Sequence, residues 1–196
     1  MHVVFGIGNP GPEYDGTRHN VGFRVIDALA ARARTTLRPV PRLDAEGATA
    51  RLEGVSALLV KPLTYVNLCG PVLRALRDRD ELPLERLLVV VDDFHLPLGT
   101  LRLRAGGGDG GHNGLRSLVE HLGTEAFPRL RIGVGERGAE PADRFVLQRF
   151  PAAERPRVDA AVARAADAAG LWARLGIDRA ASEVNRRELD ESGDKA

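Results

Sequence analysis

The sequence contains a single cysteine, Cys69, and no apolar run long enough to cross a bilayer. One cysteine excludes an intramolecular disulfide, and without a signal peptide or a membrane-spanning run we expect a cytoplasmic protein that does not associate with membranes. Neither sign of charge is in excess, because the formal net charge is +1. Any contact with a nucleic acid must therefore depend on a local cluster of arginines and not on the overall charge.

Serine is scarce as well. The chain contains only Ser56, Ser117, Ser182 and Ser192, and none of them lies in a Gly-x-Ser-x-Gly motif. Cys69 lies in the segment just before a predicted helix, where nothing singles it out as a nucleophile. A covalent nucleophile is therefore not expected, and if the chain carries out hydrolysis, the nucleophile should be water.

The segment 6–22 is rich in glycine, proline and polar residues, and it follows an apolar strand at 2–7. Its glycine spacing also matches the Gly-x-Gly-x-x-Gly fingerprint of dinucleotide-binding proteins. Pro12 and Gly16 prevent a helix from starting where that fingerprint requires one, and residues 30–34 contain no acidic side chain to hold a ribose. A nicotinamide or flavin cofactor is therefore not expected. A polar loop at the end of a strand is instead a common place for an active site.

Strands and helices alternate along the rest of the chain, which predicts an α/β fold. We expect one domain over 1–189, a three-layer sandwich whose mixed, largely parallel sheet is flanked by helices, and a frayed tail at 190–196. The predicted strands are 2–7, 48–52, 55–61, 87–91, 101–104 and 129–134, with a further short strand at 145–147. The predicted helices are 22–34, a segment from Pro71 onward, 115–122, and two segments after residue 152.

Parallel strands gather their carboxyl ends at one edge of a sheet, so the loop after the first strand should meet the end of the buried strand 87–91. This places His19 beside Asp92, and a carboxylate that accepts from one ring nitrogen makes the other nitrogen a general base near neutral pH. Three loop amides, Asn9, Asn67 and Asn113, could hold neutral polar groups of a substrate. The sequence thus predicts a base-catalysed hydrolytic site.

A metal site is a second interpretation of the acidic residues and histidines in this region. The candidate ligands are Asp92, Asp93, His95, Asp109 and His112. Their spacing matches no strong metal-binding pattern, so we expect neither a metal ion nor another cofactor.

Several motifs occur in the order found in bacterial peptidyl-tRNA hydrolases, and together they cover most of the chain. They are Gly6-x-Gly8-Asn9-Pro10-Gly11-x-x-Tyr14-x-x-Thr17-Arg18-His19-Asn20-x-Gly22, Asn67-x-x-Gly70, Asp92-Asp93 with Leu96-Pro97-x-Gly99, Gly106-Gly107-Gly108-x-Gly110-Gly111-His112-Asn113-Gly114-Leu115, and Arg129-Leu130-Arg131-Ile132-Gly133. The chain resembles that family. The resemblance implies hydrolysis of the ester between a peptide and the 3′ ribose of tRNA, which recycles tRNA from prematurely released chains.

The resemblance also implies roles for individual residues and a monomeric enzyme. His19 and Asp92 would be the catalytic pair, and Asn9 with Asn113 would position the water and the scissile carbonyl. Binding of the peptide and of the tRNA 3′ end would involve Tyr14, Tyr65, Asn67 and Asn113. Contacts to tRNA phosphates would come from Arg102, Arg104 and Arg131, which also form a basic strip by their alternation along two predicted strands.

Three positions depart from the family pattern: Val66 where methionine is usual, His95 where an acidic residue is frequent, and Asp109 where histidine is common. An alternative function is RNA binding without hydrolysis, because a hydrolase-like chloroplast protein resembles this family and serves RNA splicing. The intact His19, Asp92 and three asparagines favour the enzyme, and the lack of a transit-like segment argues against an organellar origin.

Overall fold

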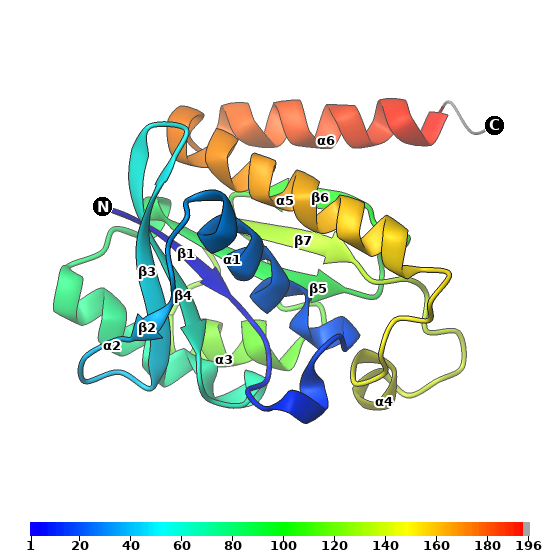
Figure 1. Cartoon of the computed structure of the whole chain (residues 1–196), viewed down its shortest axis with the longest axis horizontal. Coiled ribbons are helices and arrows are strands. Elements are labelled where there is room, and N and C mark those ends of the chain that lie inside the picture. The colour runs from blue at the N-terminus through cyan, green and yellow to red at the C-terminus, as the bar shows by residue number, and fades with distance from the viewer. Residues whose placement is uncertain (194–196) are drawn as a thin grey trace.

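The computed structural model describes residues 1–193, with side chains up to Glu188. Within these residues, seven strands form one sheet in the order β2-β3-β4-β1-β5-β7-β6 (Figure 1). The four central strands pair in parallel, and the pairs at both edges are antiparallel. The mixed sheet predicted from the sequence is therefore confirmed, with its parallel part in the centre. The strands are β1 (His2–Gly6), β2 (Arg38–Pro39), β3 (Ala45–Leu52), β4 (Val55–Pro62), β5 (Leu87–Asp93), β6 (Leu101–Arg104) and β7 (Arg129–Gly133).

Helices cover both faces of the sheet, which gives the three layers visible in Figure 1. One face packs against α1 (Val21–Arg32) and α5 (Arg155–Leu175), and the other packs against α2 (Cys69–Asp80) and α3 (Asn113–Leu122). Strand β5 is buried along its whole length because successive side chains enter the two cores in turn. Leu88 and Val90 face the α1 and α5 side, whereas Val89 and Val91 face the α2 and α3 side.

Helix α1 begins in direct contact with the centre of the sheet because Gly22 has no side chain. A Cβ atom at this position would collide with the backbone carbonyls of Ile7 and Val90. The short turn that precedes the helix, Arg18–Asn20, is therefore held over the carboxyl ends of β1 and β5. This close approach carries a polar loop to the edge where the parallel strands end.

The edge strand β6 is covered by the last helix, α6 (Ile177–Gly193), which runs along it in Figure 1. The side chain of Asn185 accepts a hydrogen bond from the backbone N–H of Leu103 at 2.9 Å and donates one to its carbonyl at 3.0 Å. Glu188 accepts from the N–H of Leu101 at 3.0 Å. These side chains occupy backbone groups that an uncovered edge strand would offer to another chain.

One expectation for the C-terminal half differs from the structure. The predicted strand at 145–147 is wrong, because these residues belong to or follow the short helix α4 (Ala142–Val146). The N–H of Phe145 bonds to the carbonyl of Pro141 at 2.9 Å, a helical spacing, and an apolar triplet is too short for its periodicity to distinguish the two structures. Helix α6 is described to Gly193, and residues 194–196 of the expected tail at 190–196 lie outside the described part.

The helices of the described part include none that combines the length and the apolar character needed to cross a bilayer.

Candidate active site

Polar side chains from several distant segments meet at the carboxyl ends of the parallel strands. His19 comes from the turn after β1, and Asp92 comes from the end of β5. His112 and Asn113 lie at the start of α3, after the glycine-rich loop, and Asn67 follows β4. Both His19 and Asp92 are nearly inaccessible, with 8% and 1% of their surface exposed.

The predicted pairing of His19 with Asp92 is present. Nδ1 of His19 lies 2.9 Å from Oδ1 of Asp92, so this nitrogen carries a proton and donates it to the carboxylate. Burial by itself lowers the pKa of His19, but the charge of Asp92 and the hydrogen bond to it together outweigh burial, and the pKa is raised. The unprotonated Nε2 is left as a base, and His19 lines a cavity of about 370 Å³.

His112 is a second imidazole on the same carboxylate oxygen. Its Nδ1 accepts the backbone N–H groups of Gly114 at 3.1 Å and Leu115 at 3.3 Å, so it caps the N-terminus of α3. Nε2 must then carry the ring proton, and it donates to Oδ1 of Asp92 at 2.9 Å. Although burial raises the pKa of Asp92, the two imidazoles outweigh burial and hold that pKa below its usual range.

His112 was considered in the sequence only as a metal ligand, and its contact with Asp92 was missed. The one sequence signal for a structural role of His112 is its place directly before a predicted helix, where a side chain that accepts backbone N–H groups is favoured. His19, Asp92 and His112 are the one group in the described residues whose ligand atoms lie close enough together for a metal ion. While His112 caps α3, however, its Nε2 holds a proton and offers no lone pair to a metal.

The other metal candidates have separate partners. Asp93 accepts the N–H of His95 at 2.8 Å and pairs with Arg131 at 3.0 Å. Asp109 accepts the N–H of Gly111 at 2.7 Å within the glycine-rich loop. The structure therefore does not bring Asp93, His95 and Asp109 into the group around Asp92.

Asn9 is held in one orientation by three hydrogen bonds. Its backbone N–H donates to Oδ1 of Asn20 at 2.9 Å, and Nδ2 of Asn20 donates back to its carbonyl at 2.9 Å. The backbone N–H of Val66 donates to Oδ1 of Asn9 at 2.9 Å. Because Oδ1 already has a donor, the free function of the Asn9 side chain is its Nδ2 amide, which can donate to a substrate oxygen. The sequence places Asn20 beside His19 in the polar loop but indicates no role for it.

Several of the other residues predicted to bind substrate surround the same cavity. Asn67, Asn113 and Tyr65 line it together with Asn9 and His19. The ring of Tyr14 packs edge-on against that of Tyr65, with 6.2 Å between centroids, so Tyr14 adjoins the cavity through its neighbour. Val66, one of the departures from the family pattern, is also a lining residue.

The three predicted tRNA-binding arginines lie on one face of the sheet. Leu101, Leu103 and Ile132 point into the core on the α1 and α5 side, so the alternating residues Arg102 and Arg131 point to the opposite face. Arg102 and Arg104 are exposed, and Arg131 is cross-strand from Arg102 but paired with Asp93.

Arg104 lies farther from the site edge, cross-strand from the buried Arg129 at the start of β7. The guanidinium of Arg129 donates to the carbonyls of Gly107 and Gly108 at 2.5 and 3.2 Å. Burial and, to a smaller extent, the nearby charge of Arg131 together lower the pKa of Arg129 to about 10. Arg129 therefore anchors the glycine-rich loop, a role for which the sequence offered no signal.

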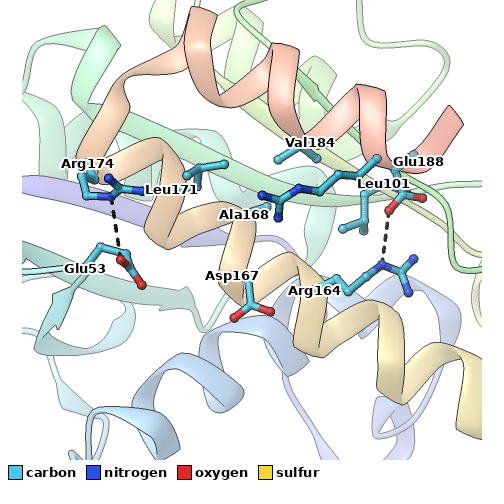
Figure 2. Close-up of a pocket in the computed structure, with 10 residues that line it drawn as sticks. Glu53, Leu101, Arg164, Asp167, Ala168, Leu171, Arg174, Val184 and Glu188 are labelled. Carbon is cyan, nitrogen blue, oxygen red and sulfur yellow. Dashed lines mark hydrogen bonds and ion pairs between the residues drawn. The ribbon is translucent and has the colours of Figure 1, made fainter. Parts of the chain in front are cut away.

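A second cavity, of about 280 Å³, lies between α5, α6, β6 and the turn from β3 to β4 (Figure 2). It shares no lining residue with the cavity at His19. Figure 2 shows Arg164 directed at Glu188 and Arg174 directed at Glu53, at 3.2 and 3.8 Å. These charges compensate each other, so we assign no ligand to this cavity.

Comparison with known proteins gives consistent matches over nearly the whole chain. The family model described as peptidyl-tRNA hydrolase matches residues 3–192. A peptidyl-tRNA hydrolase from Geobacillus kaustophilus is 49% identical over 169 residues, which cover 86% of this chain and 90% of the relative. One from Mycobacteroides abscessus is 44% identical over 93% of this chain and 94% of the relative. The crystal structure of peptidyl-tRNA hydrolase from Acinetobacter baumannii superimposes with a TM-score of 0.88 at 33% identity, over 94% of each chain.

Proposed function

This chain belongs to the peptidyl-tRNA hydrolase family, and we propose that it cleaves the ester between a peptide and the 3′ ribose of tRNA with a water molecule activated by His19 and Asp92. An N-blocked aminoacyl group would serve as a minimal peptide. The products are free tRNA and free peptide, and the biological role is to recycle peptidyl-tRNA that has dropped from ribosomes. From the family resemblance we further propose a cytoplasmic monomer that needs no cofactor.

The first chemical step is proton abstraction from water. Nε2 of His19 takes the proton while the oxygen of the water attacks the ester carbonyl carbon. Asp92 holds the ring so that Nδ1 keeps its proton, and the carboxylate stabilises the imidazolium that forms. His112 donates to the same oxygen of Asp92, which keeps the carboxylate ionised and oriented.

Attack on the carbonyl carbon moves the electrons of the C=O bond onto its oxygen. We propose that the Nδ2 amide of Asn9 and the side chain of Asn113 donate hydrogen bonds to this oxyanion or to the attacking water, and that Asn67 holds the peptide. The intermediate then breaks the bond between the acyl carbon and the ribose oxygen. The imidazolium of His19 returns its proton to that oxygen, which leaves the terminal ribose hydroxyl free.

Binding of tRNA is assigned to the arginine face of the sheet. Arg102 and Arg104 are exposed on β6 and alternate with buried leucines, so both are available to phosphates. Arg131 adjoins them on β7. We propose that this face contacts the acceptor stem while the 3′ end enters the cavity at His19 past Tyr14 and Tyr65.

The observation that carries the proposal is the short contact of His19 Nδ1 with Asp92, which leaves Nε2 as a base in a cavity lined by three asparagines. The test is release of tRNA from N-acetyl-aminoacyl-tRNA by the parent, by His19→Ala and by His95→Ala. We expect His19→Ala to lower kcat by roughly 10²–10⁴-fold with nearly unchanged tRNA affinity. His95 is exposed and serves as the control, with parent-like kcat.

The alternative, RNA binding without hydrolysis, predicts a different result in the same assay. A parent that binds tRNA yet releases none from N-acetyl-aminoacyl-tRNA would favour the binding module. Near-parental turnover by His19→Ala would remove His19 from the mechanism even if the chain is a hydrolase.

A further inference from the structure

Arg18 directly precedes the proposed base, and its charge is buried. Only 6% of its side chain is exposed. The guanidinium donates to the carbonyl of Val134 at 2.5 Å and pairs with Glu154 at 2.9 Å. It also lies over the rings of Phe145 and Phe150, 4.5 and 4.8 Å from their centroids. A buried guanidinium is costly unless such partners compensate it, so removing one partner should have large effects.

Most of these partners belong to one stretch of chain, residues 145–154, which runs from the end of α4 to the start of α5. The backbone of the same stretch is also joined to the turn before His19. The backbone N–H of Arg18 donates to the carbonyl of Gln148 at 3.0 Å, and the backbone N–H of Phe150 donates to the carbonyl of Gly16 at 3.3 Å. Thr17 and Arg149 form an isolated antiparallel bridge. The segment that carries the base is therefore fastened to the segment after α4.

Residues 142–147, here called the α4 wall, form one side of the cavity at His19. Asp143, Val146 and Leu147 line the cavity. Leu147 is open to solvent, with 45% of its surface exposed. Among the named elements, α4 packs chiefly against the turn Arg18–Asn20. The position of this wall relative to His19 therefore depends on the contacts that Arg18 makes.

We propose that Arg18 is a positioning residue that sets the spacing between His19 and the α4 wall, and that this wall contacts the side chain of the amino acid esterified to tRNA. The inference rests on the proposed function. Leu147 exposes apolar surface, and Val146, which is only 7% exposed, adds a smaller apolar part of the lining, so the wall should favour a large apolar side chain over glycine at this position. Arg18 thereby determines side-chain preference without touching the substrate.

The test compares N-acetyl-phenylalanyl-tRNA with N-acetyl-glycyl-tRNA. Arg18→Lys keeps the positive charge but loses the planar fork and the stacking on two rings. We expect the ratio of kcat/KM for phenylalanine over glycine to fall roughly tenfold, chiefly through a higher KM for the phenylalanine substrate. Arg32→Lys is the matched control, since Arg32 pairs with Asp167 between α1 and α5, and its ratio should stay at the parent value.

Two further variants keep the test decisive if Arg18→Lys folds poorly. Glu154→Gln removes only the ionic partner of Arg18 and should lower the phenylalanine preference by a smaller factor. Val146→Ala removes apolar surface from the wall itself and should lower the preference with Arg18 intact. In the double variant of Arg18→Lys with Val146→Ala, the loss of phenylalanine preference should be smaller than the sum of the two single losses, expressed as free energies. The two changes act on one contact and are therefore not additive.

Contrary outcomes separate the inference from the function on which it rests. An unchanged substrate ratio in Arg18→Lys, or in both Glu154→Gln and Val146→Ala, overturns the role of Arg18 while the parent remains a hydrolase. Equal losses on both substrates, in kcat alone, would make Arg18 a purely structural residue and also overturn it. A parent that releases no tRNA from either substrate contradicts the proposed function, and the inference with it.

Discussion

Asp92 accepts hydrogen bonds from two imidazoles on the same oxygen, and the two contacts differ in their second nitrogen. His19 lines the cavity and leaves Nε2 unprotonated, whereas His112 uses its Nδ1 to cap α3. In the proposed mechanism the first imidazole exchanges a proton with water and the ribose oxygen, whereas the second is held in one tautomer by the N–H groups of α3. A carboxylate held between them remains charged at low pH and keeps the proton of His19 on Nδ1.

The pH dependence of kcat/KM follows from the raised pKa of His19. The base must be neutral to accept a proton, so activity should rise with pH through the folded-state pKa, and the midpoint should lie above the ordinary value of about 6.5. In Asp92→Asn the carboxylate is gone and burial alone acts, so the midpoint should move to lower pH while kcat falls about 10²–10⁴-fold. A pH profile of both proteins checks this. A midpoint that stays in place in Asp92→Asn would show that another group titrates.

Substitution of His112 separates its two contacts. His112→Ala removes the helix cap and the donor to Asp92, so we expect a loss of about 1 kcal/mol in the free energy of unfolding and roughly a tenfold loss of kcat. His112→Asn can still cap α3, so it should recover the stability. Urea unfolding and tRNA release measure the two effects. If both variants turn over substrate as the parent does, the contact with Asp92 does not contribute to catalysis.

Among the elements, α6 has the role of closing the sheet. Strand β6 is short and lies at the edge, and the backbone groups on the side away from β7 bond to Asn185 and Glu188 instead of to a further strand. A helix does not normally pair with a strand edge, so side chains must supply both a donor and an acceptor. The side-chain amide of Asn185 supplies both an acceptor and a donor to the backbone of Leu103. An asparagine is therefore suited to covering this strand edge.

Asn185→Leu should therefore destabilise the fold and expose the edge. The N–H and carbonyl of Leu103 would lose their partners, for an expected loss of about 1–3 kcal/mol in the free energy of unfolding. Light scattering should also detect association through the uncovered strand. Arg186→Ala, at an exposed neighbouring position on α6, is the control for both measurements. Unfolding curves that coincide with the parent would mean that water replaces the amide without loss.

On the scale of the whole molecule, a nearly neutral protein that binds tRNA, as we propose, would do so through one basic face. The arginines of β6 and β7 lie on the side of the sheet away from α1 and α5, and they are not equivalent. Arg104 is exposed, whereas Arg131 shares its charge with Asp93, which is 5% exposed. The net attraction for phosphates should therefore come more from Arg102 and Arg104 than from Arg131.

The salt dependence of tRNA binding tests this difference. Arg104→Ala should flatten the log–log slope of affinity against salt by about one unit if it neutralises one phosphate. Arg131→Ala should flatten it by less and should also destabilise the fold, because Asp93 would lose its partner. Fluorescence anisotropy with labelled tRNA measures the slopes, and Arg174→Ala, on α5, is the control. A parental slope in Arg104→Ala would place the tRNA contact elsewhere on the molecule.

The sequence by itself determined the parallel centre of the sheet and the pairing of His19 with Asp92. The reason is that an apolar run ending in Asp92 predicts a buried strand, and parallel strands bring their carboxyl ends together. The local pattern of apolar residues is enough to identify these strands and the residues at their ends. The convergence of the loop after β1 with the end of β5 could therefore be predicted without coordinates.

Only the tertiary structure decided the contacts between segments that no local pattern connects. The orientation of His112, the pairing of Arg131 with Asp93 and the anchoring of residues 145–154 by Arg18 all depend on such contacts. Helix α4 was mistaken for a strand because its apolar triplet is too short to show a period, and Phe145 packs against Arg18, which is distant in sequence. Hydrogen-bond partners distant in sequence are selected by packing, which residue spacing does not encode.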